Sequence, residues 1–448
     1  MRTAKASTAV EQDVVTILRD LIRIDTTNRG PGDAVGEAEA VAYVRAALES
    51  VGFSPVVLAR EDAPHRQNLV LRVPGREPDL PGLLVHGHLD VVPAEPEDWS
   101  VDPFAAVERD GYVVGRGATD MKDMCASMLS VLMEWGTSGT RPRRDVVMAF
   151  VADEETDGAY GAEWLVDEHP ELFAGLEAAI GESGGVVEAH TARDGRTVRL
   201  ARVSAGERGT MHARLMARGP SGHGSRPTPR TALGDLVDAL HRLEHHRWPV
   251  HLSTVVRQQI AGVAEALDLD VSLEDEAGVE AAVDALGAAA DVTPFTIRAS
   301  TTPTVVRAGT KVNVIPGVAV AEVDVRCPPG YQGELARLLP AVVGPHVTIE
   351  HLTTAPPVEA PIDSPWFTAM GDALRSIDPE VVVVPGCLGG GTDAKAFSRI
   401  GLLCYGFAPL TLDPGGRLAR GIHGVDERVP VESLRGGRLV LGRFLEHV

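Results

Sequence analysis

The sequence predicts an α/β protein with a mostly parallel sheet, into which a second, α+β unit is inserted. Helical and strand patterns alternate along the first part of the chain, as they do in parallel sheets covered by helices. The strands there are continuous apolar runs with polar residues at the end, such as "GLLVHGHLDVVP" and "DVVMAFVADEE". After about residue 203, apolar and polar residues alternate instead, which is typical of strands with one solvent-facing side.

The first part of the chain begins with two amphipathic helical patterns. These are "VEQDVVTILRDLIRI" and "GEAEAVAYVRAALESVGF", the second of which is closed by Gly52. The elements that follow are the strands "NLVLRVPG" and "GLLVHGHLDVVP", the helix "CASMLSVLMEWG", the strand "DVVMAFVADEE", the helix "GAEWLVDEHPELF" and the strand "AAIGESGG". Polar residues gather where these strands end, which is where open α/β sheets bind their ligands.

The inserted unit has its own strands and helices. We expect strands at "GTMHARLMARGP", "TPTVVRAG", "NVIPG", "VAVAEVDVRCPP" and "HVTIEHLT", and helices at "TALGDLVDALHRLEHH" and "GELARLLPAVV". Residues 250–300 are acidic, Ala-rich and irregular, which indicates an insertion that enlarges this unit. The first unit then resumes with "WFTAMGDALRSI", "VVVVPG", "LLCYGFAP" and "VESLRGGRLVLGRFLEHV". The expected division is therefore 1–203, 204–352 and 353–448.

Composition excludes several classes of partner. The 448 residues are too many for one ordinary core. A formal charge of −21 argues against nucleic acid, because phosphate backbones attract Lys and Arg. Four cysteines without CxxC spacing predict neither a zinc finger nor a disulfide framework. We find no signal-peptide pattern and no apolar run long enough for a membrane, so we expect a cytoplasmic protein that does not bind membranes.

The motif "HGHLD" places two potential site residues at a strand end. His88 and Asp90 lie two residues apart and therefore face the same side of an extended strand. A metal-bound imidazole usually donates its other N–H to a carboxylate, and Asp90 is placed to accept it. A surface histidine at a turn, followed by a capping aspartate, explains the motif equally well.

The stretch "GRGATDMKD" puts Asp120 inside a glycine-rich turn. It lacks the third glycine and the later acidic residue of a dinucleotide-binding fingerprint. A carboxylate at a tight turn suits a cation, and its two oxygens are able to bridge a pair of ions. The alternative is an N-cap for the helix that starts near "MKDMCASML".

Three further segments place acids or a histidine at strand ends or in adjoining loops. Glu154 and Glu155 are adjacent and point to opposite sides of an extended backbone, so one can bind metal while the other acts as a base. Glu182 lies in "GESGG" and His423 in "GIHGVDERVP". Each motif alone is also compatible with an ordinary surface position.

Together, these segments offer nitrogen and oxygen ligands only. The candidate ligands are His88, Asp120, Glu155, Glu182 and His423. This donor set suits Zn²⁺, Co²⁺ or Mn²⁺ better than a thiolate site would. Five ligands with one bridging carboxylate fit two divalent ions that share a water.

Eight strings, in order along nearly the whole chain, resemble the zinc aminoacylase/carboxypeptidase family. They are "HGHLDVVP", "GRGATDMK", "DEETDGAYGAEWL", "GESGG", "GPSGHGS", "KVNVIPG", "GGGTDAKAF" and "IHGVDE". The resemblance implies a zinc-peptidase-like catalytic domain with an inserted lid or dimerisation domain. It makes His88 and Glu182 ligands of one zinc and Glu155 and His423 ligands of the other. Asp120 bridges the two, often with a cis peptide after it.

The resemblance also assigns roles beyond the ligands. It makes Glu154 the general base and Asp90 the partner of His88. His223 matches a lid histidine that reaches the other subunit of a dimer and stabilises the oxyanion. Asn313 and Arg326 match residues that contact the substrate carboxylate, and Gly390 and Gly391 lie in a loop, 389–393, that resembles a substrate-lining turn. Asp123 departs from the pattern, since "MKD" replaces "MKG", and we expect it outside the ligand set.

The predicted activity is metal-dependent hydrolysis of an amide bond beside a free carboxylate. The substrate is a small peptide or an N-acyl amino acid, and the motifs do not separate a peptidase from a deacylase. A catalytically silent metal-binding regulator is an alternative, but it needs no base beside its ligands. A two-metal phosphoesterase is another, which the strong acidity and the single lid arginine disfavour. A homodimer through the lid is expected, although the 250–300 insertion departs from the family.

Overall fold

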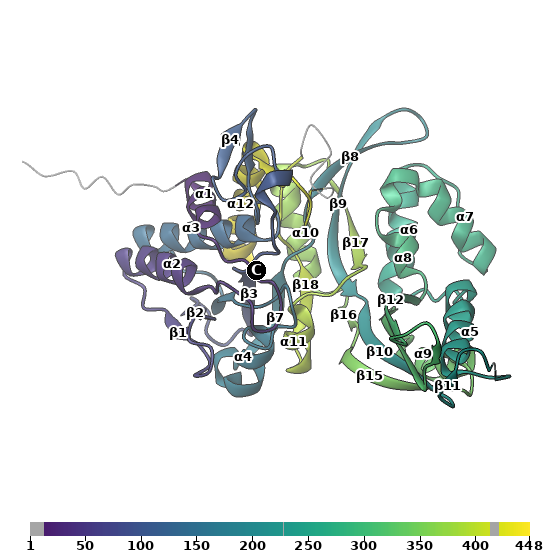
Figure 1. The fold of residues 1–448 in the computed structure, drawn as a ribbon. Helices are drawn as coiled ribbons and strands as arrows, with labels where there is room; N and C mark the ends of the chain where they lie inside the picture. The colour runs from purple at the N-terminus through teal and green to yellow at the C-terminus, as the bar shows by residue number, and fades with distance from the viewer. Residues whose placement is uncertain (1–12, 227, 413–420) are drawn as a thin grey trace, which may run out of the picture.

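The computed structural model describes residues 13–226, 228–412 and 421–448. Two units are visible in Figure 1, one built on a ten-stranded sheet and the other on a four-stranded sheet. Among the described residues, no helix is long and apolar enough to cross a membrane.

The large sheet carries the strand ends that the sequence singled out. Its order is β1 (Val56–Leu58), β2 (Asn68–Val73), β6 (Val146–Val151), β3 (Gly82–His88), β7 (Leu176–Gly181), β18 (Leu403–Gly406), β9 (Thr197–Glu207) and β16 (Val358–Glu359). β3 runs parallel to β6 and β7, and β18 runs parallel to β7. β8 (Val187–Thr191) and β17 (Val382–Leu388) pair with β9. The predicted α/β fold with a mostly parallel central sheet is confirmed.

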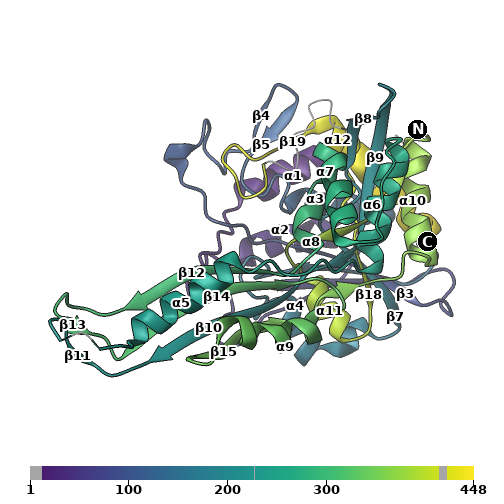
Figure 2. The same ribbon diagram turned by 90° about the vertical axis from the view of Figure 1, so that its right-hand side faces the viewer.

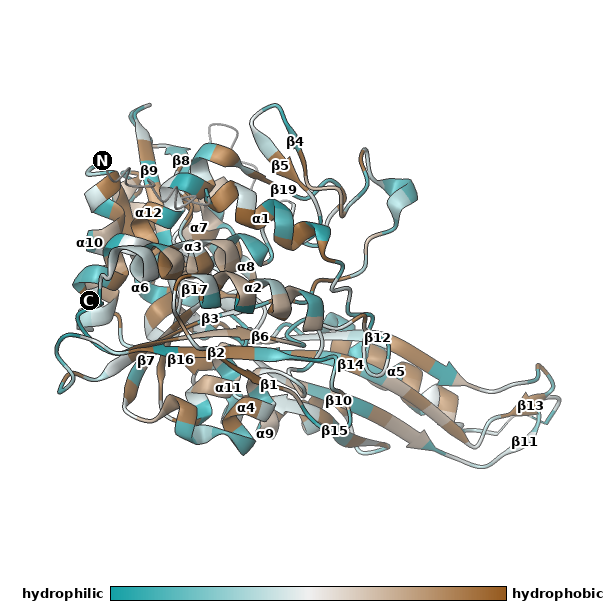
Figure 3. Cartoon of the chain, turned by 90° about the vertical axis from the view of Figure 1, so that its left-hand side faces the viewer, coloured by the Kyte–Doolittle hydropathy of each residue, from teal (hydrophilic) through white to brown (hydrophobic). Residues whose placement is uncertain are grey.

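The central strands are buried on both faces, which explains their continuous apolar runs. Leu83 and Val85 of β3 face one core, while Leu84 between them faces another. The first core contains α1 (Val14–Arg23), α2 (Ala38–Ser50), α3 (Lys122–Ser138), α10 (Pro365–Ile377) and α12 (Val431–His447). The second contains α4 (Ala162–Glu168) and α11 (Ala394–Arg399). Figure 3 shows these central strands in the colours of apolar residues.

The smaller unit, called the lid here, has an antiparallel sheet and its own core. The sheet order is β12 (Ser300–Ala308), β14 (Val318–Cys327), β10 (Gly209–Arg218) and β15 (Val347–Ala355). α5 (Ala232–His245) and α9 (Gln332–Val343) cover it. The lid extends away from the large sheet, with β11 (Gly222–His223) and β13 (Val314–Ile315) at its far end (Figure 2).

Residues 250–300 differ from expectation. They form α6 (Thr254–Ala266), α7 (Glu276–Leu286) and α8 (Thr293–Thr296). α6 packs against β17 and β9 of the large sheet and α8 against β17, while α7 packs against α6 (Figures 1 and 2). Ile260 and Val263 belong to the core of the large unit. A Cβ on Gly262 would come within 2.9 Å of Val384 on β17, so this glycine permits the close approach of α6. The expectation of an irregular segment that enlarges the lid was wrong, because the helices carry an apolar stripe that matches the edge of the large sheet.

Two connections position the site. Only Arg208 separates β9 of the large sheet from β10 of the lid. A small sheet, β19 (Arg428–Pro430), β5 (Tyr112–Val114) and β4 (Val107–Arg109), joins the C-terminal segment to the strand before the "GRGATDMKD" loop. The boundaries after residues 203 and 352 remain predictions.

Candidate metal centre

The five candidate ligands come together at one edge of the large sheet. His88 ends β3, Glu155 follows β6 and Glu182 follows β7. Because these strands are parallel neighbours, their carboxyl ends meet there. Asp120 reaches the same place from the turn before α3, and His423 from the turn before β19.

Asp120 lies between the two histidines. Its Oδ1 is 3.1 Å from His88 Nε2, and its Oδ2 is 3.0 Å from His423 Nε2. Glu155 Oε2 lies 3.1 Å from the same nitrogen of His423. One aspartate oxygen therefore faces each histidine, as a bridging ligand requires. The peptide bond between Asp120 and Met121 is cis.

The donor atoms are close enough to share cations. Potential ligand atoms of His88, Asp120 and Glu155 lie within 4.8 Å of one another, and so do those of His88, Glu154 and Glu182. Glu155 Oε1 is buried without a hydrogen-bond partner. An unpaired buried carboxylate oxygen is costly unless a proton or a cation reaches it. The residues present therefore fit divalent cations.

The electrostatics of the cluster lead to the same conclusion. Burial, followed by the charge of Glu182, raises the pKa of Glu154 well above its ordinary value. Hydrogen bonds to Asp120 and Glu155 raise the pKa of His423 to about 10. Burial lowers the pKa of His88, but the carboxylates of Asp120 and Asp90 beside it outweigh burial and raise it well above the usual value. Bound protons thus reduce the repulsion between the clustered carboxylates, and bound cations would displace these protons.

The carboxylate of Asp90 does not accept the imidazole N–H of His88, contrary to the expectation from the sequence. His88 Nδ1 donates to the carbonyl oxygen of Asp90 at 2.9 Å, whereas the nearest Asp90 carboxylate oxygen is 3.6 Å away. This bond leaves Nε2 free to face the cluster. The Asp90 carboxylate instead accepts the backbone N–H groups of Glu154 and Glu155, both at 3.2 Å. Asp90 therefore orients the acid pair as well as the imidazole.

A buried polar network that the sequence analysis missed supports Asp90. Asn28 donates to Asp90 at 2.9 Å and to Asp153 at 3.0 Å. Arg66 bonds both Glu37 and Asp153 at 2.9 Å. No pattern in the sequence marks these residues as partners, because they come from segments far apart in the chain.

The backbone of the "GRGATDMKD" turn binds a carboxylate of the protein itself. The buried carboxylate of Glu427 accepts the backbone N–H groups of Gly117, Thr119 and Asp120 at 3.1, 2.7 and 3.2 Å. Arg116 donates to it at 2.6 Å. Glu427 follows His423 by four residues, so this contact holds the Asp120 turn and the His423 turn together. The motif "IHGVDE" contains this glutamate, but the sequence analysis gave it no role.

A cavity of about 600 Å³ lies beside the cluster. Asp120 and Glu182 border it, as do Gly390 and Gly391, the two glycines expected near the substrate. Much of the remaining lining is apolar and comes from several elements: Met121, Val186, Val292, Phe295, Leu388, Leu410 and Ile422. Asp123 also lines the cavity, and it is not part of either ligand group among the described residues.

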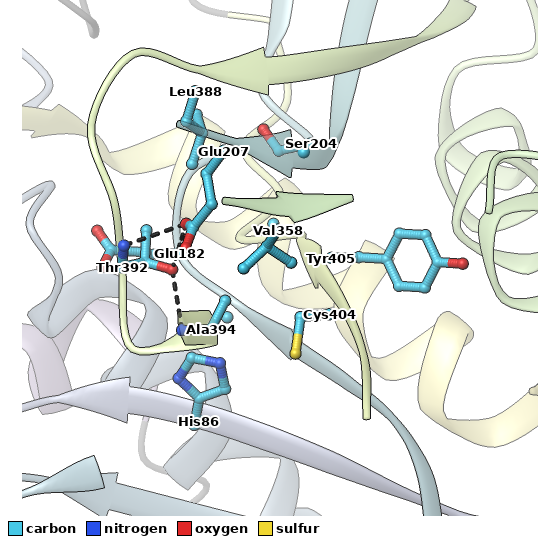
Figure 4. A pocket seen from close by; sticks show the side chains of 13 residues that line it. His86, Glu182, Ser204, Glu207, Val358, Leu388, Thr392, Ala394, Cys404 and Tyr405 are labelled. Atoms are coloured by element: carbon cyan, nitrogen blue, oxygen red, sulfur yellow. Dashed lines mark hydrogen bonds between the residues drawn. The ribbon is translucent and has the colours of Figure 1, made fainter. Parts of the chain in front are cut away.

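The end of β9 holds the glycine-rich loop in place (Figure 4). Glu207 accepts hydrogen bonds from Thr392 N at 3.1 Å and Thr392 Oγ1 at 2.9 Å, and Ala394 N donates to the same hydroxyl at 3.1 Å. Figure 4 shows a small pocket at this place, which Glu182 lines together with Glu207, Thr392 and Ala394. The loop 389–393 is therefore held against the end of β9, next to the start of the lid, and it borders the same cavity as Glu182.

The predicted lid residues do not join the cluster within one chain. His223 and Asn313 are exposed at the far end of the lid, where the carbonyl of Asn313 accepts the Gly224 N–H at 2.8 Å. Arg326 lines neither described pocket, and its guanidinium is paired with Asp324 through bonds of 2.7 and 3.1 Å. A substrate-binding role for these three residues remains a prediction.

Comparisons with known proteins show the family of this chain. The sequence model of peptidase family M20/M25/M40 matches residues 84–447. The chain is 30% identical to the human N-fatty-acyl-amino acid synthase/hydrolase PM20D1, covering 81% of this chain and 73% of that protein. It is 27% identical to mouse aminoacylase-1, covering 90% and 88%.

Solved structures share the fold. The M20 family metallo-carboxypeptidase Sso-CP2 from Sulfolobus solfataricus superimposes with a TM-score of 0.70 at 17% identity, covering 97% of this chain and 99% of that one. Human carnosine dipeptidase 1 gives a TM-score of 0.65 at 19% identity, covering 97% and 96%. At these identities the likeness concerns the fold alone.

Proposed function

Because the chain belongs to peptidase family M20/M25/M40 and is a hydrolase, we propose that it cleaves the amide bond of N-acyl amino acids, beside the free carboxylate. One observation carries the proposal: nitrogen and oxygen atoms from different segments lie close enough together to bind the same cations. They belong to His88, Asp120, Glu155, Glu182 and His423. We propose Zn²⁺ as the metal, since imidazole and carboxylate ligands suit it.

Two divalent cations bound there would lower the pKa of a shared water and polarise the amide carbonyl. Glu154 takes the proton of the attacking water and later gives it to the leaving nitrogen. Its Oε2 lies 3.9 Å from His88 Nε2, so the base is adjacent to the ligands. Asp90 holds the Glu154 backbone in position through the bond at 3.2 Å.

The acyl group occupies the apolar part of the cavity. Val292 and Phe295 from the α8 region, together with Leu410, line it. Such a lining suits a hydrocarbon chain better than a charged side chain. The names of the PM20D1 and aminoacylase-1 relatives point to the same substrate class.

The lid completes the site from a second copy of the chain. His223 is exposed at the end of the lid, away from the ligands of its own chain. In a homodimer it would enter the partner's site and donate a hydrogen bond to the developing oxyanion. The dimer and the cytoplasmic location remain predictions.

A substrate panel tests the proposal. Protein reconstituted with Zn²⁺, Co²⁺ or Mn²⁺ is offered N-acyl amino acids of increasing chain length, dipeptides and a phosphate monoester, and products are followed by liquid chromatography. We expect metal-dependent release of free amino acid, fastest with apolar acyl chains. If the protein binds metal but hydrolyses no amide, the alternative of a catalytically silent metal-binding regulator is favoured. Release of phosphate would favour the alternative of a two-metal phosphoesterase.

A further inference from the structure

Arg208, the residue between β9 and β10, is a buried cation without an anionic partner. Its side chain is 4% exposed, and its Nε has no hydrogen-bond partner. The hydroxyl of Ser300 accepts a bond from its guanidinium. Among the described residues, no carboxylate forms an ion pair with it.

Two other arginines, Arg202 and Arg326, already have anionic partners. Arg202, which also borders the cavity, pairs with Glu188 at 2.8 Å. Arg326, opposite Thr210 in the lid sheet, pairs with Asp324 through its Nε and one Nη. Arg208 therefore differs from both in having its charge uncompensated.

An uncompensated buried charge destabilises the folded protein unless an anion reaches it. Burial, followed by repulsion from Arg326, lowers the pKa of Arg208 to about 10, so the group remains charged at neutral pH. A lysine or carboxyl group in such a place can neutralise itself near pH 7, but a guanidinium does not. Arg208 is thus suited to bind an anion that the protein itself does not supply.

The position of Arg208 indicates which anion. It lines the same cavity as Asp120, Glu182 and the glycines of the 389–391 loop. Ser300, its hydroxyl partner, is the first residue of β12, so the subsite is built from the junction of the two units. A ligand that binds Arg208 and extends along the cavity reaches the metal centre.

We propose that Arg208, with Ser300, binds the carboxylate of the substrate and so replaces Arg326 in the role that the family resemblance gave it. This inference rests on the proposed function, which places a carboxylate beside the scissile amide. A planar guanidinium binds a carboxylate through two parallel hydrogen bonds. A carboxylate also suits the site better than a doubly charged phosphate, because Asp120, Asp123 and Glu182 border the same cavity.

The test compares an N-acyl amino acid with its primary amide, which has the same shape but no charge. Wild-type protein should prefer the acid, and Arg208→Gln should lower kcat/KM for the acid by about 30-fold or more, mainly through KM. The amide should be affected little. Arg208→Lys loses the paired bonds and can lose its proton in the empty site, but a bound carboxylate favours the charged ammonium, so this variant should recover only part of the preference.

Arg326→Gln is the matched comparison. If it abolishes the preference while Arg208→Gln keeps it, Arg326 is the carboxylate anchor and the inference is wrong. Circular dichroism verifies folding of each variant. If Arg208→Gln does not fold, Ser300→Ala tests the same subsite. The inference is overturned if the ratio of KM for the acid to KM for the amide is unchanged in both Ser300→Ala and Arg208→Lys.

Calorimetry separates this inference from the proposed function. The N-acyl amino acid and its amide are titrated into metal-free protein, where no turnover occurs. If the acid binds in a way that depends on Arg208, but the protein hydrolyses no amide when metal is added, the subsite is supported and the proposed reaction is rejected. Equal binding of acid and amide to wild-type protein rejects the subsite.

Discussion

The metal centre and the far end of the lid differ in how completely one chain builds them. At the centre, segments from five parts of the chain converge, and the buried side chains of His88 and Asp120 contact one another directly. At the lid end, His223 and Asn313 face solvent and contact none of the ligands. The comparison teaches that a single chain brings the candidate ligands together, while the proposed roles of His223 and Asn313 require another copy.

The largest expected effect comes from the centre itself. Glu154→Gln removes the proton acceptor while keeping the shape of the side chain, so kcat should fall by about 1,000-fold or more. Metal content, measured by mass spectrometry, should be unchanged because all five candidate ligands remain. Full activity in this variant would remove Glu154 from its role.

The lid end gives the next effect. His223→Ala should lower kcat by about 100-fold through loss of one oxyanion donor, with metal content unchanged. Mixing this variant with Glu154→Gln should restore activity, since a mixed dimer has one site with both residues intact. A monomer in sedimentation analysis, or no restoration after subunit exchange, would contradict the second-copy role.

A smaller effect tests how the centre is held together. Glu427→Gln weakens the bonds that join the Asp120 turn to the His423 turn, so metal affinity should fall about 10-fold. Asp123→Asn is the control, because Asp123 is buried nearby but lies outside the ligand groups. Equal metal affinity in both variants, measured by competition with a chelator, would show that the Glu427 contact does not position the ligands.

The smallest effect is the pH dependence of metal-free protein. The folded pKa of His423 is raised from 6.5 to about 10, so its contribution to stability is present below pH 6.5 and is lost as pH rises toward 10. The raised pKa of Glu154 acts in the same direction, because unfolding lets this carboxyl ionise. Denaturation across this range should therefore show falling stability, with a weaker slope in His423→Gln. A flat profile in wild-type protein would contradict the clustered charges.

The sequence indicated three of the five candidate ligands because their positions follow from chain geometry. His88, Glu155 and Glu182 follow apolar runs that predict parallel strands, and parallel strands end at one edge. Asp120 and His423 lie in loops, so their convergence rested on the family resemblance, and the structure brings both to the cluster. The partners of these residues were missed: Glu427 and Asn28 are polar residues in loops, and nothing local distinguishes them from surface positions.

The sequence by itself therefore determined the fold class and the donor atoms of the centre, since periodicity and residue chemistry are local properties. The tertiary structure alone decided which side chains face one another. It placed α6–α8 on the large sheet, enclosed Glu427 within the Asp120 turn, and paired Arg326 with Asp324 while leaving Arg208 unpaired. These outcomes depend on packing and on hydrogen-bond distances between segments far apart in the chain, which no local pattern specifies.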